Sequence, residues 1–270
     1  MAFIMSSLPE ITIKDLTLDS FDDVIYVCSI GKIMKSEYVK GAKLKREWFK
    51  EHIDMFPELC KIAYLGNEPV AQITLYPHSL DPLYRGLNGK AIIIHCIYCP
   101  FKKAQRKGIA KKLVEKVKKY AKEHGYDFVI ANAFDTGEFL PMPKFYEKIG
   151  FTKMMDLEDH YYVSLTSKEP KLPPCSYEED PEDREKAIIF YSRVCHVFYP
   201  LSLIIKKAIS DLLPNYSIVM IDYWKNPELF LKKGKNWLIV NDVPIKAWFQ
   251  EKEKFRQEVL EASRRAQHKE

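Results

Sequence analysis

The sequence of 270 residues lacks any apolar run near the ~18–20 residues that a membrane-spanning helix needs, so no membrane segment is expected. Its start, Met1 to Ser7, has neither the basic region nor the long apolar core of a signal peptide. Six cysteines are too few for a disulfide scaffold in a chain of this length, which indicates a reduced, cytoplasmic protein. Lysine and arginine (42) exceed aspartate and glutamate (37) only slightly, and the net charge of +5 gives no general case for nucleic-acid binding.

The clearest change of composition lies between residues 166 and 183. Three prolines gather within residues 170–174, and an acidic stretch follows them. Proline removes a backbone donor and disfavours helix at the residue before it, so this segment is interpreted as an extended linker. The length, with 47% hydrophobic residues, suits two globular domains. We predict a first domain at residues 1–166, a linker at 167–183 and a second domain at 184–270.

Apolar periodicity in the first domain alternates between strand and helix. Helical spacing is strongest from Gly108 to His124, where lysines fill the polar faces. The β-branched run Ala91–Tyr98 is typical of a buried central strand. Further strands are expected at Ile11–Leu16, Leu59–Leu65, Val70–Tyr76, Asp127–Phe134 and Phe151–Leu165, and further helices from Asp19 (as the cap) to Ser29, at Lys45–Met55 and at Pro143–Ile149. This order predicts the α/β class.

The junction between the strand Ala91–Tyr98 and the helix that follows has the chemistry of an anion site. A helix N-terminus exposes unpaired N–H groups and the positive end of the helix dipole. Gly108 and Ala110 are small enough to let a diphosphate reach the backbone. Positive potential comes from Lys102, Lys103, Arg106 and Lys107. Taken alone, the loop is equally consistent with a solvated basic surface.

The stretch Gln105-Arg106-Lys107-Gly108-Ile109-Ala110 resembles the acyl-CoA-binding signature of the GNAT N-acetyltransferase superfamily, Gln/Arg-x-x-Gly-x-Gly/Ala. A second segment, Phe145-Tyr146-Glu147-Lys148-Ile149-Gly150-Phe151, is similar to the Tyr-x-x-x-Gly-Phe pattern of the same family. Both stand in the expected order, with a helix and a strand between them. The resemblance covers roughly residues 9–166 and implies the GNAT fold, an α/β (α+β) architecture with a mixed, splayed central sheet.

The resemblance also implies acetyl-CoA, or another acyl-CoA, as cosubstrate and no metal. The backbone N–H groups of Arg106 to Ala110 would hold the diphosphate, and the strand end would line the pantetheine arm and polarise the thioester carbonyl. The cofactor-binding residues implied are Cys96, Ile97, Tyr98, Gln105, Arg106, Lys107, Gly108, Ile109 and Ala110. Tyr146 would protonate the departing CoA thiolate as general acid.

An acceptor amine must lose a proton before it attacks, and the general base is less clearly indicated. His95, near the end of the central strand, is the first candidate, with a structural core histidine as the alternative. Asp135 and Glu138 are the next candidates, and His78 follows them. The family often carries an asparagine seven residues before the tyrosine, and this sequence departs from that pattern with Phe139.

Cys96 and Cys99 form a Cys-x-x-Cys pair on the central strand and the residue that follows it. Residues three apart on an extended strand face opposite sides, so the two thiols are poorly placed to chelate zinc or to form a redox pair. We therefore expect no metal site.

The order of elements in residues 184–270 resembles the thioredoxin fold, as a smaller α/β domain. Cys195 stands at the start of the expected helix, where the helix dipole would lower a thiol pKa, which makes it a candidate reactive thiol. The redox motif lacks its second cysteine, because position 198 is Phe198. Pro244 resembles the proline beside a thioredoxin substrate site, although an ordinary strand-start proline is the alternative. The combination resembles a small prokaryotic family with a YoaP-type C-terminal domain.

The sequence thus predicts an N-acetyltransferase that moves an acetyl group from acetyl-CoA to a primary amine, by direct attack, with a small-molecule or peptide acceptor. The alternative is a thiol-based redox or partner-binding protein led by the second domain, with the first domain as a CoA sensor. Nucleic-acid binding through Lys102–Lys122 is disfavoured, because the interleaved aromatic residues that stack on bases are missing. Neither the acceptor, the acyl chain nor the oligomeric state follows from the sequence.

Overall fold

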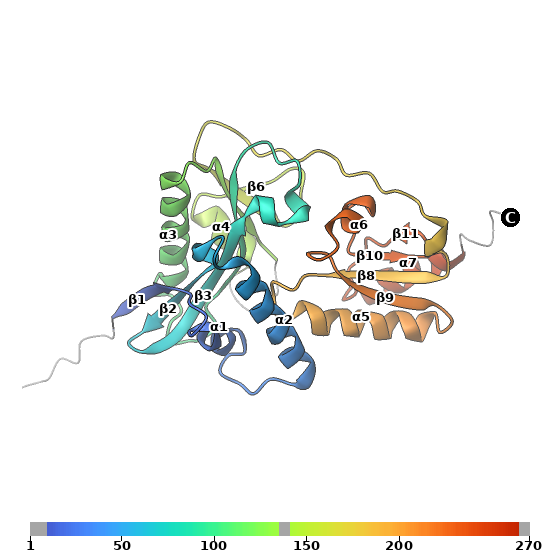
Figure 1. Cartoon of the computed structure of the whole chain (residues 1–270), viewed down its shortest axis with the longest axis horizontal. Helices are drawn as coiled ribbons and strands as arrows, with labels where there is room; N and C mark the ends of the chain where they lie inside the picture. The colour runs from blue at the N-terminus through green and yellow to red at the C-terminus, as the bar shows by residue number, and fades with distance from the viewer. Residues whose placement is uncertain (1–9, 135–140, 265–270) are drawn as a thin grey trace, which may run out of the picture. The chain divides into compact units, whose positions relative to one another are not determined.

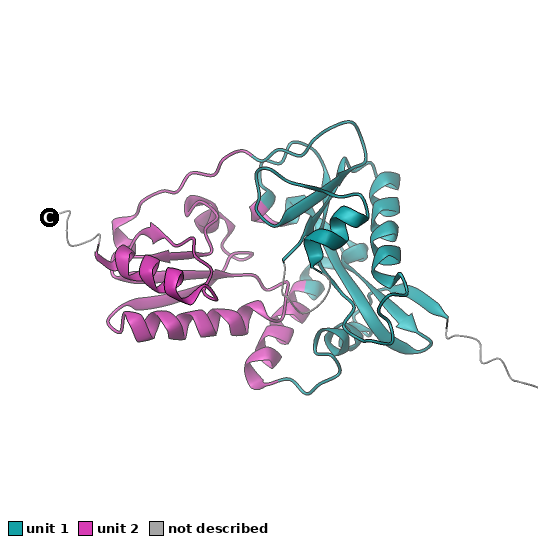
Figure 2. Cartoon of the chain, turned by 180° about the vertical axis from the view of Figure 1, so that it is seen from behind, with its two compact units in different colours: residues 1–34, 49–80, 84–172 teal, residues 35–48, 81–83, 173–270 magenta. Residues whose placement is uncertain are grey.

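The computed structural model describes residues 10–134 and 141–264. The chain divides into two compact units, which are coloured separately in Figure 2. Unit 1 comprises residues 1–34, 49–80 and 84–172, and unit 2 comprises residues 35–48, 81–83 and 173–270. Helix α2 (Ser36–His52) therefore contributes residues to both units. No helix in the described part of the chain has the length and apolar content needed to cross a membrane.

Unit 1 is built on a mixed sheet whose described residues form seven strands in the order β1-β2-β3-β4-β5-β7-β6. Strands β1, β2, β3 and β6 of this sheet are labelled in Figure 1. The strands are β1 (Ile11–Asp15), β2 (Cys60–Leu65), β3 (Glu68–Pro77), β4 (Ala91–Tyr98), β5 (Phe128–Asn132), β6 (Thr152–Lys153) and β7 (His160–Ser164). Strands β4 and β5 run parallel, whereas the other neighbouring strands run antiparallel. The parallel pair needs a crossover connection, and helix α3 (Ile109–Glu123) supplies it.

Strands β4 and β5 separate in the middle of the sheet. Their pairing runs from Ala91 opposite Phe128 to Ile94 opposite Ala131, and among the described residues it stops there. Strand β4 continues to Tyr98 and remains paired with β3 on its other side. The mixed, splayed sheet expected from the sequence is therefore present.

A β-bulge on β4 lies at the same point. Leu75 of β3 faces Ile94, and Thr74 faces Cys96, which leaves His95 as the extra residue on β4. A bulge bends its strand and turns the side chains there. The bulge thus coincides with the point where β4 leaves β5.

The remaining elements of unit 1 cover this sheet. They are α1 (Phe21–Cys28), α4 (Met142–Lys148), and the short 3-10 turns η1 (Pro57–Leu59) and η2 (His78–Leu80); a third turn, η3 (Pro82–Tyr84), ends in unit 1. Helix α3 buries the apolar stripe formed by Ile109, Leu113, Val114, Val117 and Ala121. The long helix and the central strand predicted from the periodicity are confirmed, since β4 has the predicted bounds and α3 begins directly after Gly108.

Several predicted boundaries are wrong, among them those of α1, β3 and α2. Helix α1 has Ser20 rather than Asp19 at its N-cap, and the Ser20 hydroxyl accepts a hydrogen bond from the Thr17 N–H, 3.0 Å away. Strand β3 already begins at Glu68, because the chain reverses over two residues, Gly66 and Asn67. Helix α2 begins nine residues before the predicted start at Lys45, since its first turns are too polar to carry an apolar stripe.

Unit 2 contains a second mixed sheet, of four strands in the described residues, in the order β11-β10-β8-β9. Its elements are η4 (Pro181–Asp183), β8 (Lys186–Tyr191), α5 (Phe198–Leu212), β9 (Ser217–Asp222), α6 (Pro227–Lys232), β10 (Leu238–Val240), β11 (Val243–Pro244) and α7 (Lys252–Arg264). Strands β8 and β9 are parallel, and β10 and β11 add antiparallel neighbours. Strand β11 spans only the two residues Val243 and Pro244.

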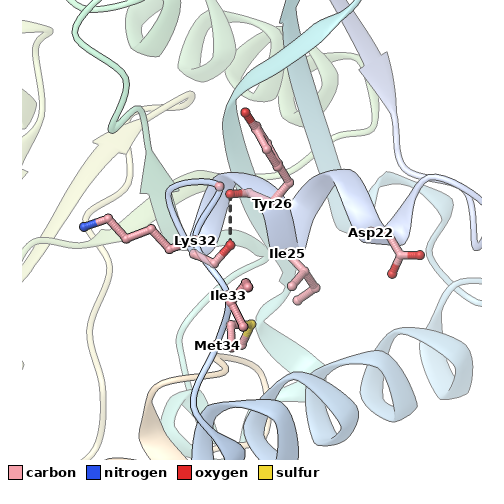
Figure 3. Close-up of a pocket in the computed structure, with 8 residues that line it drawn as sticks. Asp22, Ile25, Tyr26, Lys32, Ile33 and Met34 are labelled. Carbon is pink, nitrogen blue, oxygen red and sulfur yellow. Dashed lines mark hydrogen bonds between the residues drawn. The ribbon is translucent and has the colours of Figure 1, made fainter.

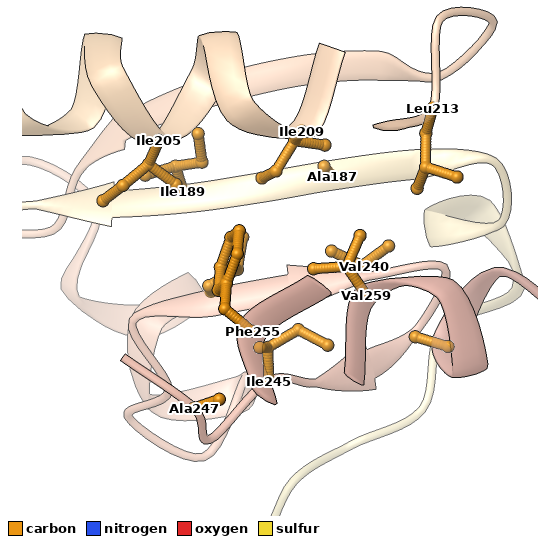
Figure 4. Packing of buried hydrophobic residues seen from close by; sticks show 12 residues of the cluster. Ala187, Ile189, Ile205, Ile209, Leu213, Val240, Ile245, Ala247, Phe255 and Val259 are labelled. Atoms are coloured by element: carbon orange, nitrogen blue, oxygen red, sulfur yellow. The ribbon is translucent and has the colours of Figure 1, made fainter. Parts of the chain in front are cut away.

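The two faces of the unit 2 sheet carry different helices. Ala187 and Ile189 of β8 pack in one apolar cluster with side chains of α5 and α7, such as Ile209 and Phe255 (Figure 4). The alternate β8 residues Ile188 and Phe190 pack in another cluster with Phe230 of α6. Because successive strand residues point to opposite faces, α5 and α7 cover one face and α6 covers the other.

Candidate functional site

The N-terminus of α3 is open. Its N-cap is Gly108, at φ +73°, and the cap makes no side-chain hydrogen bond. A Cβ added to Gly108 would meet no atom of the described residues within 4 Å. Arg106 also adopts a positive φ, 59°. Left-handed residues among right-handed ones turn successive N–H groups toward one side, and together with the first-turn amides of a helix this makes an anion-binding concavity.

The basic residues at this end of α3 are not equivalent. Lys102, Arg106 and Lys107 are exposed. Lys103 instead forms an ion pair with Glu68 of β3, and this hydrogen bond lowers the pKa of Glu68 below its ordinary range. The positive charge left for an anion therefore comes from three of the four residues singled out in the sequence.

Two residues of the signature have structural partners. The Gln105 side-chain amide donates to the carbonyl oxygens of Cys99 (3.4 Å) and Pro100 (3.2 Å), which ties the loop to the end of β4. The Ile109 side chain is 1% exposed and belongs to the core. Only the backbone of Ile109 can face a ligand, whereas Ala110 is half-buried at the first turn of α3. The assignment of these residues to CoA binding stays a prediction.

The end of β4 lies beside the opening of the sheet. Cys96, Ile97 and Tyr98 come after the last residue that pairs with β5, so this edge of the strand faces the gap. The Cys96 Sγ accepts a hydrogen bond from the amide of Gln72 on β3, 3.4 Å away. Residue Ile97 is 9% exposed. The backbone of this segment thus lies where the described residues of β4 and β5 have separated.

Tyr146 on α4 is fully buried and packs against the ring of Phe151, with 5.0 Å between ring centroids. Its hydroxyl has no hydrogen-bond partner among the described residues. Burial, and to a smaller extent the nearby Cys96 thiol, raises the pKa of Tyr146 above its ordinary value. The phenol therefore keeps its proton, and its donor group is unused.

His95, the bulge residue of β4, is half-buried, and its Nδ1 lies 3.1 Å from the hydroxyl of Tyr76. His78 accepts a hydrogen bond from the Ala91 N–H at 3.2 Å, and burial lowers the pKa of this histidine. The other candidates, Asp135 and Glu138, lie outside the described residues, as does Phe139. His95 is thus the candidate base that stands at the sheet opening.

The Cys-x-x-Cys pair does not stand out as a reactive site. Burial raises the pKa of the Cys99 thiol to about 11, which keeps it protonated at neutral pH. In the described segments, no group of three or more histidine, cysteine, aspartate or glutamate residues is arranged to hold a metal ion.

Sequence reasoning missed two polar residues at the sheet opening. Asn132 ends β5, and its Cα pairs in register with His160, the first residue of β7. Both carry a buried polar atom with no hydrogen-bond partner in the described structure, Asn132 Oδ1 and His160 Nε2. A polar residue that ends an apolar strand was a signal for Asn132, but no local pattern in the sequence pointed to His160.

A hollow of about 390 Å³ lies on unit 1 beside α1. Its lining comes from the outer face of α1, including Asp22 and Tyr26, and from the segment that follows, including Ile33 and Met34 (Figure 3). The Tyr26 ring stacks on Phe101, with 5.6 Å between centroids, and so links α1 to the loop that follows β4.

In unit 2, Cys195 is half-buried and stands three residues before α5. Beside it in the chain, Arg193 is 2% exposed and pairs with Asp222, at 3.4 Å, and with Glu47 of α2, at 3.2 Å. His196 is 6% exposed, and burial lowers its pKa to about 3. A buried polar cluster thus surrounds the chain next to Cys195.

The acetyltransferase (GNAT) family model matches residues 29–151. No curated protein matches the chain. Among solved structures, the chain is similar to an N-acetyltransferase from Staphylococcus aureus Mu50 (17% identity, 58% of this chain, 99% of that chain, TM-score 0.42). It is also similar to the PaiA N-acetyltransferase from Thermoplasma acidophilum in complex with coenzyme A (17% identity, 57% of this chain, 96% of that chain, TM-score 0.41). A third similar structure is a chain of the NatC complex bound to Gag peptide and CoA (20% identity, 58% of this chain, 99% of that chain, TM-score 0.42). The family match thus indicates an acetyltransferase (GNAT) domain at residues 29–151, which supports an acyltransferase that depends on acetyl-CoA.

Proposed function

We propose that unit 1 transfers an acetyl group from acetyl-CoA to the primary amine of an acceptor by direct attack. The observation that carries this proposal is the combination of three features of the same unit. The N-terminus of α3 is open at Gly108, β4 continues past Ile94, its last described residue that pairs with β5, and the buried hydroxyl of Tyr146 has no partner among the described residues. These features support an acyl-CoA as the ligand, because they offer groups for its diphosphate, its pantetheine arm and its departing thiolate.

The proposed binding roles follow from these features. The amides of Arg106 to Ala110 hold the diphosphate, with Lys102, Arg106 and Lys107 adding positive charge. The main chain of Cys96, Ile97 and Tyr98 hydrogen-bonds the pantetheine arm, and one N–H of this segment polarises the thioester carbonyl. Gln105 keeps the loop in place through the carbonyl oxygens at the end of β4.

Two side chains carry the proton transfers in this proposal. Bound acetyl-CoA supplies the acetyl group as an activated thioester. Tyr146 donates its hydroxyl proton to the departing thiolate, since burial keeps the phenol protonated until charge develops beside it. His95, held at the sheet opening by the hydroxyl of Tyr76, accepts the proton that the amine loses. Because both reactants are held on one splayed sheet, proximity supplies much of the rate.

The test combines a titration with one substitution. In calorimetry, acetyl-CoA should bind the wild type, and its failure to bind would overturn the proposal. Tyr146→Phe should retain that affinity and lose roughly 10²–10⁴-fold in turnover, the usual contribution of a positioned acid. Tyr161→Phe is the matched control, because Tyr161 belongs to the same part of unit 1 but its hydroxyl is bonded to Glu147.

The acceptor is proposed to be a small molecule or a peptide that carries a primary amine. A turnover screen with acetyl-CoA against amino acids, polyamines, aminoglycosides and peptide N-termini would identify its class. Release of CoA without a matching acetylated product would count as hydrolysis rather than transfer, so the product is measured by mass spectrometry.

We propose that the chain consists of a first domain at residues 1–166, a linker at 167–183 and a second domain at 184–270. We propose a thioredoxin-like fold for the second domain. The sheet order β11-β10-β8-β9, with α5 and α7 on one face and α6 on the other, supports this fold. A dithiol redox function gains no support, because Phe198 occupies the position of the second cysteine. Alkylation of Cys195 at the rate of an ordinary thiol would exclude single-thiol chemistry. The cytoplasmic location stays a prediction from the sequence.

A further inference from the structure

His160 is held in one tautomer by its surroundings. Its Nδ1 lies 2.7 Å from the carbonyl oxygen of Glu158, and because a carbonyl can only accept, Nδ1 carries the proton. Nε2 therefore presents a lone pair. This atom is buried and has no partner in the described residues. Burial also lowers the pKa of His160 to about 4, so the ring is neutral at physiological pH.

Asn132 presents a second acceptor of the same kind. Its Oδ1 is buried without a partner among the described residues. Because Asn132 pairs in register with His160 on adjacent antiparallel strands, their Cβ atoms lie roughly 4.5–5.5 Å apart on one face of the sheet. Two unused acceptors therefore stand side by side at the end of β5.

The same face of the sheet carries the candidate base. Tyr76 pairs with Ile93, and Ile93 pairs with Ile130, so these three side chains share a face. Asn132 lies two residues beyond Ile130 and points to that face too. The hydroxyl of Tyr76 reaches His95, and β4 has already left β5 at this level. The two acceptors thus border the opening at which His95 stands.

Buried acceptors without donors are costly, and their chemistry restricts what satisfies them. A carbonyl, a carboxylate or a phosphate brings only further acceptors, whereas an amine or ammonium group brings two or three N–H donors. We propose that His160 Nε2 and Asn132 Oδ1 accept hydrogen bonds from the reacting amine of the acceptor and hold it at the sheet opening. This inference rests on the proposed acetyltransferase function and adds the residues that bind its acceptor.

The direct test observes the histidine side chains of the full chain by NMR after ¹⁵N-histidine labelling, with His160 assigned from His160→Gln. We expect a neutral ring with Nε2 unprotonated, and a saturable change of the Nε2 resonance as n-propylammonium chloride is added at tens of millimolar. Potassium chloride at equal ionic strength should leave it unchanged, and the exposed His124 serves as the internal control. A proton on Nε2, or no saturable change with CoA present and absent, would overturn the proposal.

A kinetic arm uses two matched variants. His160→Asn can still donate to the carbonyl of Glu158 but lacks the acceptor, whereas His160→Gln places an oxygen near the position of Nε2. With acetyl-CoA and n-propylamine, His160→Asn should raise the KM for the amine by roughly tenfold or more, as expected when one hydrogen bond to a charged donor is lost. Asn132→Leu should have a similar effect, and His160→Gln should restore most of the affinity. The acetyl-CoA affinity should stay within twofold throughout, and an equal loss in both His160 variants would contradict the assignment.

The two hypotheses fail separately. If the wild type does not bind acetyl-CoA, the proposed function is wrong. The change of the His160 Nε2 resonance on adding n-propylammonium can still be measured in that case. If acetyl-CoA binds and the amine is acetylated, but the His160 resonance and the KM of His160→Asn do not change, only the assignment of the acceptor site is wrong.

Discussion

Replacing Gly108 with alanine, in comparison with the same change at Gly125, separates two effects of the substitution. One is the backbone strain of alanine in a left-handed conformation, and the other is the loss of ligand binding. Gly108 has φ +73°, and among the described residues no atom lies within 4 Å of an added Cβ. Gly125, just past the other end of α3, has φ +67° and equally open surroundings. An alanine in this backbone region costs about 1–2 kcal/mol. Both variants should therefore lose similar stability, with a melting temperature lower by roughly 2–8 °C.

Only Gly108→Ala should weaken binding of CoA. Its methyl group would occupy the surface on which the diphosphate is proposed to rest. Loss of one hydrogen bond from a backbone N–H to a charged phosphate costs about 1.5–3 kcal/mol, or roughly 10–150-fold in Kd. Calorimetry with CoA and thermal unfolding of both variants make the comparison. Wild-type affinity in Gly108→Ala would refute the proposed diphosphate site, and an equal loss in Gly125→Ala would show that strain alone explains the effect.

Three further predictions concern stability. A Cβ on Gly41 would lie 2.0 Å from the carbonyl oxygen of His196. Although alanine normally stabilises a helix, Gly41→Ala should therefore lower the free energy of unfolding by about 1–3 kcal/mol in urea. A more stable variant would contradict this close contact. Asp222→Asn removes a charge partner from the buried Arg193 and should cost about 3 kcal/mol; an unchanged unfolding midpoint would show that the pair contributes little. The pKa of His160 is lowered to about 4 from 6.5, so the unfolded chain binds a proton between these values that the folded chain does not. Stability should therefore fall as the pH is lowered through this window, and His160→Gln, measured at pH near 7 and near 5, should lose that part of the dependence.

Local patterns predicted the elements on which the cosubstrate site is proposed. The β-branched run Ala91–Tyr98 became β4 with the predicted bounds, and the helical periodicity after Gly108 became α3. The open helix N-terminus follows from Gly108 itself, because glycine tolerates a positive φ and offers no capping side chain. These features depend on residues close together in the chain, so their positions could be read from spacing alone.

Other features depend on residues far apart in the sequence. Lys103 appeared to add to the basic cluster, yet it pairs with Glu68, which lies 35 residues earlier. Asn132 and His160 become neighbours only through the β5–β7 register. The first residues of α2 were missed because that stretch has little apolar patterning, and residues 35–48 fall in unit 2 although they precede most of unit 1 in the chain.

The sequence by itself determined which candidate groups are available, namely a basic helix start with a glycine, the tyrosine proposed as proton donor and a set of histidines. The tertiary structure alone decided which of these groups have unused hydrogen-bonding capacity at the sheet opening. That capacity depends on cross-strand pairing and burial, which leave polar atoms of Tyr146, His160 and Asn132 buried with no partner among the described residues. Periodicity specifies the form of a segment, but the partners of its side chains are set only when distant segments pack together.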